Sequence, residues 1–465
     1  MNRIMIKRTV ALIAGLMLFG ACKDSTGVPD LNNVSSSLLQ SGLNRSSVQL
    51  LMTGLLNADR GNLGVIFPET MARDIYRIDS AEPRWISELV GVPADPGGFV
   101  GGGMWVGYFA EIAAANNLID NIKTATDLSA QEQAATTGLA RTIKALAYYR
   151  VIEMRDTLGL PIDVDHGINA PPAPFVCKSN GLAYVSALLD SAYADLQTAG
   201  ATAFPFVLPS GFTVSGDYST PAAFAAWNRG LKGKVELYRG LDHAHPNAAS
   251  FAAAISALNT AIGPLDPSAL NNSIYYVYST APGDATAPLV DAAIHLNPAV
   301  GDSIQPGDLR AVEITRRATP ATGQGVTTNY DYTYAVPSIG SNLTRPIPVL
   351  TIAELVLLRA QAEIATNNLA AATADINFVR VNQGGLAPYA TFANATAAIN
   401  AVLYEKRYSL LATGAQRFVD LRAYGRLNGT YLKKETATDV FQTALPIPTR
   451  EVNARGGTVP TPVCN

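Results

Sequence analysis

The stretch TIAELVLLRAQAEIATNNLAAATADINFVRVN, residues 351–382, decides the fold class of this chain. Thr351 and Glu354 stand three residues apart at the start of an apolar run, which is the pattern of a capping box at a helix N-terminus. Leucine and alanine then recur at helical spacing until an Asn-Asn pair interrupts the pattern, and a second helical run follows over 369–381. Two alanine-rich helices joined by a short turn predict a helical hairpin of the tetratricopeptide type.

The same helical spacing appears earlier in the chain. Ile143, Ala147, Val151 and Met154 step by four, four and three residues, so they would share one helix face. The sequence therefore predicts a mostly α fold.

The expected domain organisation follows from these patterns. We expect one domain over 41–465, with helical hairpins at about 45–250 and 345–425. Residues 250–345 contain Gly, Pro and Thr with short β-like runs, which predicts an irregular, loop-rich region between the helical blocks. Long loops often carry binding sites, so this region is the expected ligand face.

The N-terminus has the layout of a secretory signal peptide. Arg3, Lys7 and Arg8 precede an apolar run over 9–19, and small residues follow. The run is shorter than the roughly 20 residues that a membrane-spanning helix needs. We therefore assign residues 1–21 to a signal peptide.

Cys22 comes directly after these small residues, which resembles a lipobox, the site where signal peptidase II cuts and the cysteine is lipidated. The alternative is an ordinary signal peptide cut near Ala21, with Cys22 as a free thiol. Residues 22–40 are polar with Gly and Pro and predict a flexible tether. Lys23-Asp24 resembles signals that send lipoproteins to the cell surface.

Composition and charge restrict the class of protein. The chain has 465 residues, of which 48% are hydrophobic, enough for a large core. The formal net charge is −3 and there are no basic runs, so no nucleic-acid partner is expected.

If Cys22 is lipidated, Cys177 and Cys464 remain. Outside the cytoplasm such a pair can oxidise to a disulfide, which in the entropic model stabilises the fold by about 4–5 kcal/mol. The alternative is two free thiols that never meet.

Five segments, in order, resemble the SusD/RagB family. They are Trp105–Tyr108 with Glu111–Asp120, Ala140–Tyr149 with Leu158–Ile162, Trp227–Tyr238, Pro348–Glu354 through Asn377–Arg380, and Glu405–Tyr408 with Gly414, Arg417–Arg422 and Leu445–Pro448. The resemblance spans most of the chain after the signal peptide. It implies a SusD-like fold of tetratricopeptide-type hairpins.

The resemblance also implies a function. Members are lipid-anchored, surface-facing outer-membrane proteins that bind a nutrient, with an oligosaccharide as the first expectation, and deliver it to a SusC-like TonB-dependent transporter. It implies no enzyme activity, cofactor or metal. Two alternatives stay open: a tetratricopeptide-like envelope scaffold without a nutrient ligand, and a glycoside hydrolase with paired carboxylates.

Charged residues lie among apolar ones near the C-terminus: Glu405, Arg407, Arg417, Asp420 and Arg422. Partly buried arginines need carboxylate partners, so we expect a structural ion-pair network. The rival interpretation is a catalytic acid–base pair.

No catalytic motif is recognisable. Asp242-His243-Ala-His245 could suggest metal ligands, but the spacing of two does not suit a helix, and a surface loop is the favoured interpretation.

Aromatic residues in loops are the candidate ligand contacts, because rings stack on the apolar faces of sugars. Trp85 lies in a polar stretch with a proline, and Arg84 beside it could bind hydroxyls or a carboxylate. Tyr330, Tyr332 and Tyr334 alternate, so on a strand they would share one face. The alternative is that these rings pack onto the helices.

Other aromatic residues are assigned to packing. Tyr275, Tyr276 and Tyr278 have more apolar neighbours in the sequence. The residues Trp105, Tyr108, Tyr148 and Tyr149 fall within helical patterns, where rings usually belong to the core.

Overall fold

The computed structural model describes residues 42–97, 99–166 and 170–464. The predicted signal peptide, Cys22 and the predicted tether lie outside the described residues.

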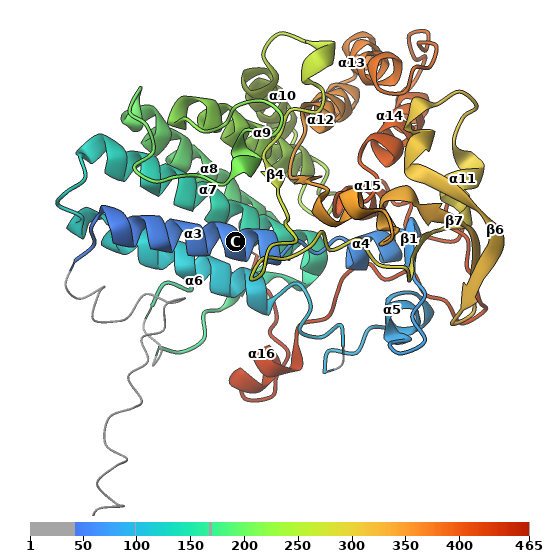
Figure 1. Ribbon diagram of the computed structural model, residues 1–465, viewed down its shortest axis with the longest axis horizontal. Coiled ribbons are helices and arrows are strands. Elements are labelled where there is room, and N and C mark those ends of the chain that lie inside the picture. Colours follow the sequence, from blue (N-terminus) through green and yellow to red (C-terminus); the bar gives the residue numbers. More distant parts are fainter. Residues whose placement is uncertain (1–41, 98, 167–169, 465) are drawn as a thin grey trace, which may run out of the picture.

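Helices of the N-terminal half form one layered block (Figure 1). The long ones are α3 (Arg45–Gly61), α6 (Val106–Asn121), α7 (Ala130–Arg155), α8 (Lys178–Ala199), α9 (Pro221–Gly240) and α10 (Ala249–Ile262). Short helices between them are α4 (Ile66–Met71) and α5 (Arg84–Ile86), the latter followed by a π-helical turn, η1 (Ser87–Gly91). Helices α7 to α10 pack each against the next, as stacked helical hairpins do.

The C-terminal half adds a second helical block, coloured orange to red in Figure 1. Its helices are α12 (Ile352–Ala365), α13 (Leu369–Asn382), α14 (Ala395–Ser409) and α15 (Gln416–Ala423). The short helix α16 (Thr449–Ala454) lies apart from them, next to the N-terminal block. Helix α12 packs against α9 and α10 as well as against α13 and α14. The stretch that predicted the fold therefore joins the two blocks through one continuous apolar core.

The start of α12 differs from the capping box that we predicted. Thr351 Oγ1 accepts a hydrogen bond from the Glu354 backbone N–H at 3.1 Å, as expected of an N-cap. The Glu354 carboxylate, however, lies 3.0 Å from Lys234 Nζ of α9. A buried carboxylate is stabilised more by a charged partner than by a backbone N–H, so the reciprocal bond of the box is absent from this described helix.

The region between the blocks is more regular than predicted. It contributes three strands to a four-stranded sheet of order β1-β5-β7-β6, paired antiparallel throughout. The strands are β1 (Ile75–Arg77), β5 (Ile294–Leu296), β6 (Ile314–Gly323) and β7 (Val326–Tyr332), with α11 (Pro298–Ser303) after β5. Gln324 and Gly325 turn the β6–β7 hairpin with φ of 49° and 84°, the signs that a type I′ turn requires.

Two further pairs of short strands make up the rest of the β-strands in the described residues. Strand β2 (Leu160–Pro161) pairs with β3 (Phe175–Val176), and β4 (Tyr275–Tyr276) pairs with β8 (Ile347–Pro348). The β4–β8 ladder lies between the two helical blocks, next to the start of α12.

The aromatic and apolar residues that we assigned to helix packing are buried, which confirms that prediction. Trp105, Tyr108, Tyr148 and Tyr149 are buried, as are the four apolar residues that predicted the face of α7. No helix among the described residues is both long enough and apolar enough to cross a membrane.

The C-terminal charges form ion pairs, as expected, but mostly with partners outside their own segment. The pairs are Arg407–Asp74 at 2.7 Å, Arg417–Asp74 at 2.9 Å, Arg380–Glu405 at 2.9 Å, Arg310–Glu405 at 2.7 Å, Lys406–Asp420 at 2.6 Å and Arg422–Asp156 at 3.3 Å. Because each carboxylate is held by a buried or half-buried cation, these groups fit a structural network rather than a catalytic pair.

Candidate functional site

A cavity of about 320 Å³ opens beside the β4–β8 ladder and the end of β7. Aromatic, apolar and charged side chains line it together, including Tyr275, Tyr332, Tyr334, Glu313 and Arg345. This combination of rings with a few polar groups is typical of small-molecule and sugar sites.

Two tyrosines and an arginine form the polar wall of the cavity. The Arg345 guanidinium carbon lies 3.3 Å from the centre of the Tyr334 ring, and the Tyr332 and Tyr334 rings meet edge to face at 5.5 Å. Tyr332 is buried, whereas Tyr334 is half-buried and Arg345 keeps 38% of its side-chain surface exposed. The stacked ring restricts the guanidinium, so its donors are held in place at the cavity.

Glu313 supplies the carboxyl group of this wall. Its Oε1 lies 3.4 Å from Nη2 of Arg345. Burial raises the pKa of Glu313 to about 7, against the opposing effect of Arg345. Near neutral pH the group is therefore present both as carboxylate and as acid, and it can accept or donate hydrogen bonds to hydroxyl groups.

The tyrosines of 275–278 divide between core and cavity. Tyr276 and Tyr278 are buried, as predicted, and Tyr276 Oη donates to Asp59 Oδ2 at 2.8 Å. Tyr275, which we assigned to packing, is half-buried and lines the cavity, while its hydroxyl donates to the Asn271 carbonyl oxygen at 2.6 Å. The alternation of strand β4 explains the split, because neighbouring residues face opposite sides.

The expectation that Tyr330, Tyr332 and Tyr334 share one strand face is wrong. Strand β7 ends at Tyr332, and Tyr334 lies in the following 3₁₀ turn, Thr333–Ala335. Tyr330 packs over Gly301 of α11, donates to Asp302 Oδ1 at 2.7 Å and does not line the cavity. The turn takes Tyr334 out of the sheet and brings it to Arg345.

Trp85 and Arg84 also lie elsewhere than predicted. They belong to the short helix α5, because Pro83 starts a helical turn instead of an open loop. The Trp85 ring is half-buried, with its centre 5.3 Å from that of Phe67 and 4.6 Å from that of Phe99. Neither Trp85 nor Arg84 lines the cavity, so the structure does not bring the two sets of candidate residues together.

The guanidinium of Arg84 already has a partner, the carboxylate of Glu82. Its Nε donates to Glu82 Oε1 at 2.7 Å, and its guanidinium lies 5.1 Å from the centre of the Phe99 ring. Arg84 therefore packs on the same Phe99 ring that contacts Trp85, an arrangement that the sequence did not reveal.

Glu313 and Arg345 were not foreseen. Glu313 lies among other charges in DLRAVEITRR, residues 308–317, whereas Arg345 is a single charge before Pro346, and only the fold brings the two together with Tyr334. An arginine directly before a proline in the expected ligand region was the available signal.

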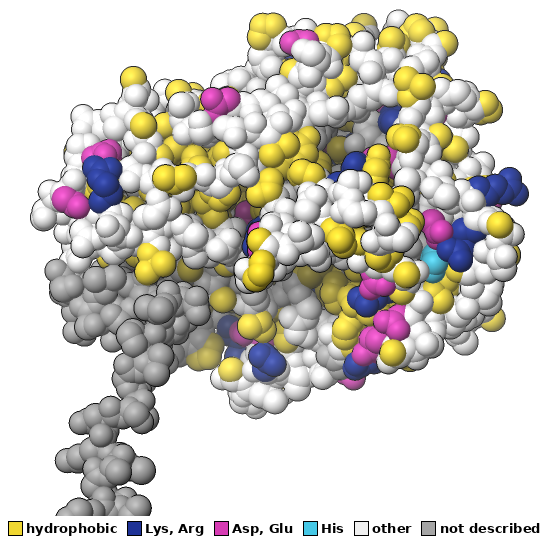
Figure 2. Space-filling model, viewed as in Figure 1, with side chains coloured by type: hydrophobic (Ala, Val, Ile, Leu, Met, Phe, Trp, Pro, Cys, Tyr) yellow, Lys and Arg dark blue, Asp and Glu magenta, His cyan; other side chains and the backbone are white. Residues whose placement is uncertain are grey.

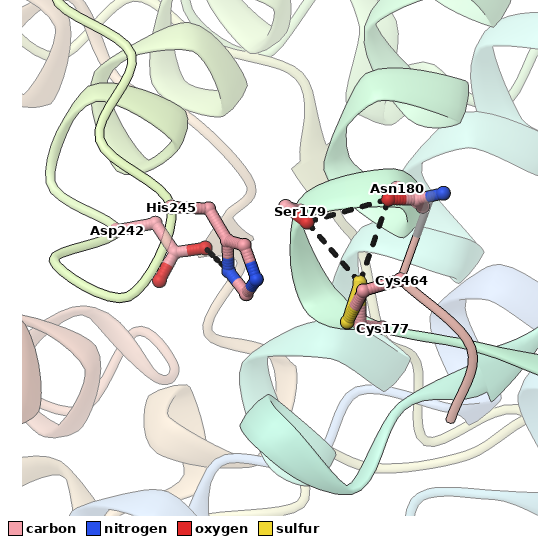
Figure 3. The surroundings of a disulfide bond; sticks show 6 residues. All are labelled: Cys177, Ser179, Asn180, Asp242, His245 and Cys464. Carbon is pink, nitrogen blue, oxygen red and sulfur yellow. Dashed lines mark hydrogen bonds and ion pairs between the residues drawn. A yellow bond between two sulfur atoms is a disulfide. The ribbon is translucent and has the colours of Figure 1, made fainter. Parts of the chain in front are cut away.

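The structure pairs Cys177 with Cys464 as a disulfide, with a Cα–Cα distance of 5.2 Å (Figure 3). The two histidines of the Asp-His-Ala-His stretch diverge. Nε2 of His243 lies 2.9 Å from the Ala423 carbonyl oxygen, whereas His245 lies beside the disulfide.

Figure 2 shows that apolar and uncharged polar side chains cover most of one face of the molecule, with charged side chains only in small groups. No basic stripe is visible on that face.

Comparison of the sequence with protein-family models and with curated proteins found no match. Solved structures do match. They include surface glycan-binding protein A from Bacteroides uniformis (15% identity, TM-score 0.66, covering 85% of this chain and 92% of that chain). A SusD superfamily protein from Parabacteroides distasonis has 13% identity and a TM-score of 0.65, covering 91% and 98%. Surface glycan-binding protein A from Bacteroides thetaiotaomicron, in complex with laminarihexaose, has 13% identity and a TM-score of 0.63, covering 89% and 98%.

These likenesses extend over most of each chain at low sequence identity, so it is the arrangement of helices and strands that is shared. The chain has the fold of the SusD superfamily, which confirms the fold that its sequence motifs predicted.

Proposed function

We propose that this protein is a non-catalytic glycan-binding protein that captures an oligosaccharide in the cavity lined by Tyr275, Tyr332, Tyr334, Glu313 and Arg345. The observation that carries the proposal is the stacking of Arg345 on Tyr334 at the wall of that cavity. Aromatic rings suit the C–H faces of sugars, and the charged pair suits their hydroxyl groups. A solved structure of the same fold contains laminarihexaose, which supports a glycan as the ligand class.

Binding without hydrolysis fits the charges of the cavity. Glycoside hydrolases use two carboxyl groups about 5–9.5 Å apart. Of the described residues that line the cavity, Glu313 alone carries a carboxyl group. The proposal therefore assigns no catalytic residue.

The protein acts, in this proposal, at the outer membrane. Lipid on Cys22 anchors it at the cell surface, and a SusC-like TonB-dependent transporter receives the bound glycan. The lipobox-like sequence around Cys22 and the likeness to SusD superfamily structures support this part. Co-purification of an outer-membrane barrel with the lipidated protein tests it, and a gene for such a transporter is expected next to the gene of this protein.

A glycan array with protein lacking residues 1–22 tests the ligand class. We expect binding of at least one oligosaccharide family without release of products. Tyr334→Ala should weaken that binding by about fivefold or more, in line with about 1–3 kcal/mol for a stacked ring. Tyr431→Ala is the matched control, because Tyr431 is an exposed tyrosine outside the cavity. Equal losses in the two variants, or hydrolysis of the glycan, would contradict the proposal.

A further inference from the structure

Three side chains that commonly bind metal ions lie together outside the lining of the proposed glycan cavity: Cys177, Cys464 and His245. One possible ligand atom from each lies within 4.8 Å of the others. Cys177 is the buried N-cap residue of α8, while Cys464 and His245 are exposed, which leaves the group open to solvent. The three residues come from segments that are distant in the sequence, so the spacing of residues does not predict that they lie together.

The orientation of His245 suits a ligand. Its Nδ1 lies 3.4 Å from Oδ2 of Asp242, a buried carboxylate oxygen with no hydrogen bond to the described residues. Figure 3 shows the His245 ring between Asp242 and the cysteine pair, with its other nitrogen on the side of the sulfur atoms. A carboxylate beside one ring nitrogen, with the other nitrogen directed to the ion, is the usual arrangement behind a metal-bound histidine.

Whether such a site exists depends on the oxidation state of the cysteine pair. As a disulfide it holds the C-terminal segment, in which Val463 also accepts from the Cys177 N–H at 3.0 Å and donates to the Phe175 carbonyl oxygen at 2.9 Å. After reduction the two sulfurs can become thiolates, and two thiolates with one imidazole are a ligand set of Zn²⁺. Ligand atoms around tetrahedral zinc lie about 3.5 Å apart, so the exposed Cys464 and His245 would have to move only slightly.

We propose that the reduced protein binds one Zn²⁺ through Cys177, Cys464 and His245, with water as the fourth ligand. Reduction by a low-molecular-weight thiol consumes two thiols and the protein disulfide and yields two cysteine thiols and one small disulfide. Binding of the ion then releases the two thiol protons. The C-terminal segment is thus fixed to α8 in both states, by a covalent bond when oxidised and by the metal when reduced.

Cobalt titration tests this site, because Co²⁺ with thiolate ligands absorbs visibly. The full chain with Cys22→Ser is used, so that two cysteines remain, and a phosphine reduces the disulfide without adding a thiol ligand. In that step the disulfide, the phosphine and one water molecule become two thiols and phosphine oxide. We expect one Co²⁺ per reduced chain, none per oxidised chain, and displacement of Co²⁺ by Zn²⁺.

The two histidines of one loop provide a matched pair of variants. His245→Gln should weaken Co²⁺ binding at least tenfold, whereas His243→Gln should leave it unchanged, because His243 faces Ala423 instead of the sulfurs. Circular dichroism follows folding throughout. Unfolding on reduction that Zn²⁺ reverses would support the site, and unfolding that it does not reverse would overturn it. Two free thiols without a cobalt spectrum, or equal binding by the two variants, would also overturn it.

Discussion

Arg345 stacks on Tyr334 with 3.3 Å between the guanidinium carbon and the ring centre, and the same guanidinium lies 3.4 Å from the Glu313 carboxylate. One cation thus links a ring and a carboxyl group that are 21 residues apart in the sequence. The relationship places a stacking surface, a donor and an acceptor at one wall of the cavity, which is what binding of a polyhydroxylated ligand needs.

Replacement of Arg345 should affect binding more than folding. Arg345→Gln removes the charged donors, so we expect glycan affinity to fall about tenfold or more, as for loss of a charge-assisted hydrogen bond. Because the side chain is 38% exposed, the melting temperature should change little. Isothermal titration calorimetry and thermal melting measure the two effects. A large loss of stability with unchanged affinity would contradict the assignment.

Glu313 should make stability depend on pH. Its pKa is raised to about 7 by burial, whereas an unfolded glutamate titrates near about 4.3. Between these values the folded state holds the proton more tightly, so this group's contribution to the free energy of unfolding falls as pH rises toward 7 and is constant above it. Glu313→Gln should therefore gain on the order of 3–4 kcal/mol relative to wild type between pH 4 and pH 8. Urea unfolding at several pH values measures this difference, and a gap that stays constant with pH would refute the raised pKa.

The packing of Trp85 leads us to expect that its replacement lowers the stability of the fold. Its ring packs against both Phe67 and Phe99 and is half-buried, so Trp85→Ala should cost about 1–3 kcal/mol, less than for a fully buried aromatic residue. Glycan affinity should stay within twofold, since Trp85 does not line the cavity. An unchanged melting temperature combined with lost binding would instead assign the site to α5.

Asp74 should be essential for folding. Its carboxylate is buried and forms ion pairs with two arginines. Oδ1 lies 2.7 Å from Arg407 Nη2, and Oδ2 lies 2.9 Å from Arg417 Nε. Asp74→Asn removes the carboxylate that both half-buried guanidinium groups contact, so we expect a loss of about 3–5 kcal/mol. Glu82→Gln breaks an exposed ion pair and should leave the melting temperature unchanged. Similar melting temperatures for the two variants would contradict the role of Asp74.

Helical periodicity predicted the blocks well because each helix repeats one pattern over many residues. The face of α7 at Ile143, Ala147, Val151 and Met154 is buried as expected. The sheet was harder to foresee, because β1 and β5 have three residues each and become strands only by pairing with distant segments. Strands this short carry almost no alternation of their own.

The site was predicted only in part, for a related reason. Tyr332 and Tyr334 were named from their alternation, and both line the cavity, although a turn rather than a strand places Tyr334 there. Glu313 and Arg345 become part of the site through contacts between segments that are distant in the sequence. The spacing of charges along the chain does not predict such contacts. His245 is a third case, since its neighbours Cys177 and Cys464 are far from it in the sequence.

The position of a bound glycan tests the central claim most directly. A crystal structure of the protein with an oligosaccharide selected on the array should show one sugar ring against Tyr334 or Tyr275, with its hydroxyl groups within hydrogen-bond distance of Arg345 or Glu313 and all glycosidic bonds intact. A sugar bound at Trp85 or elsewhere, with the cavity empty, or a cleaved glycan would contradict the account.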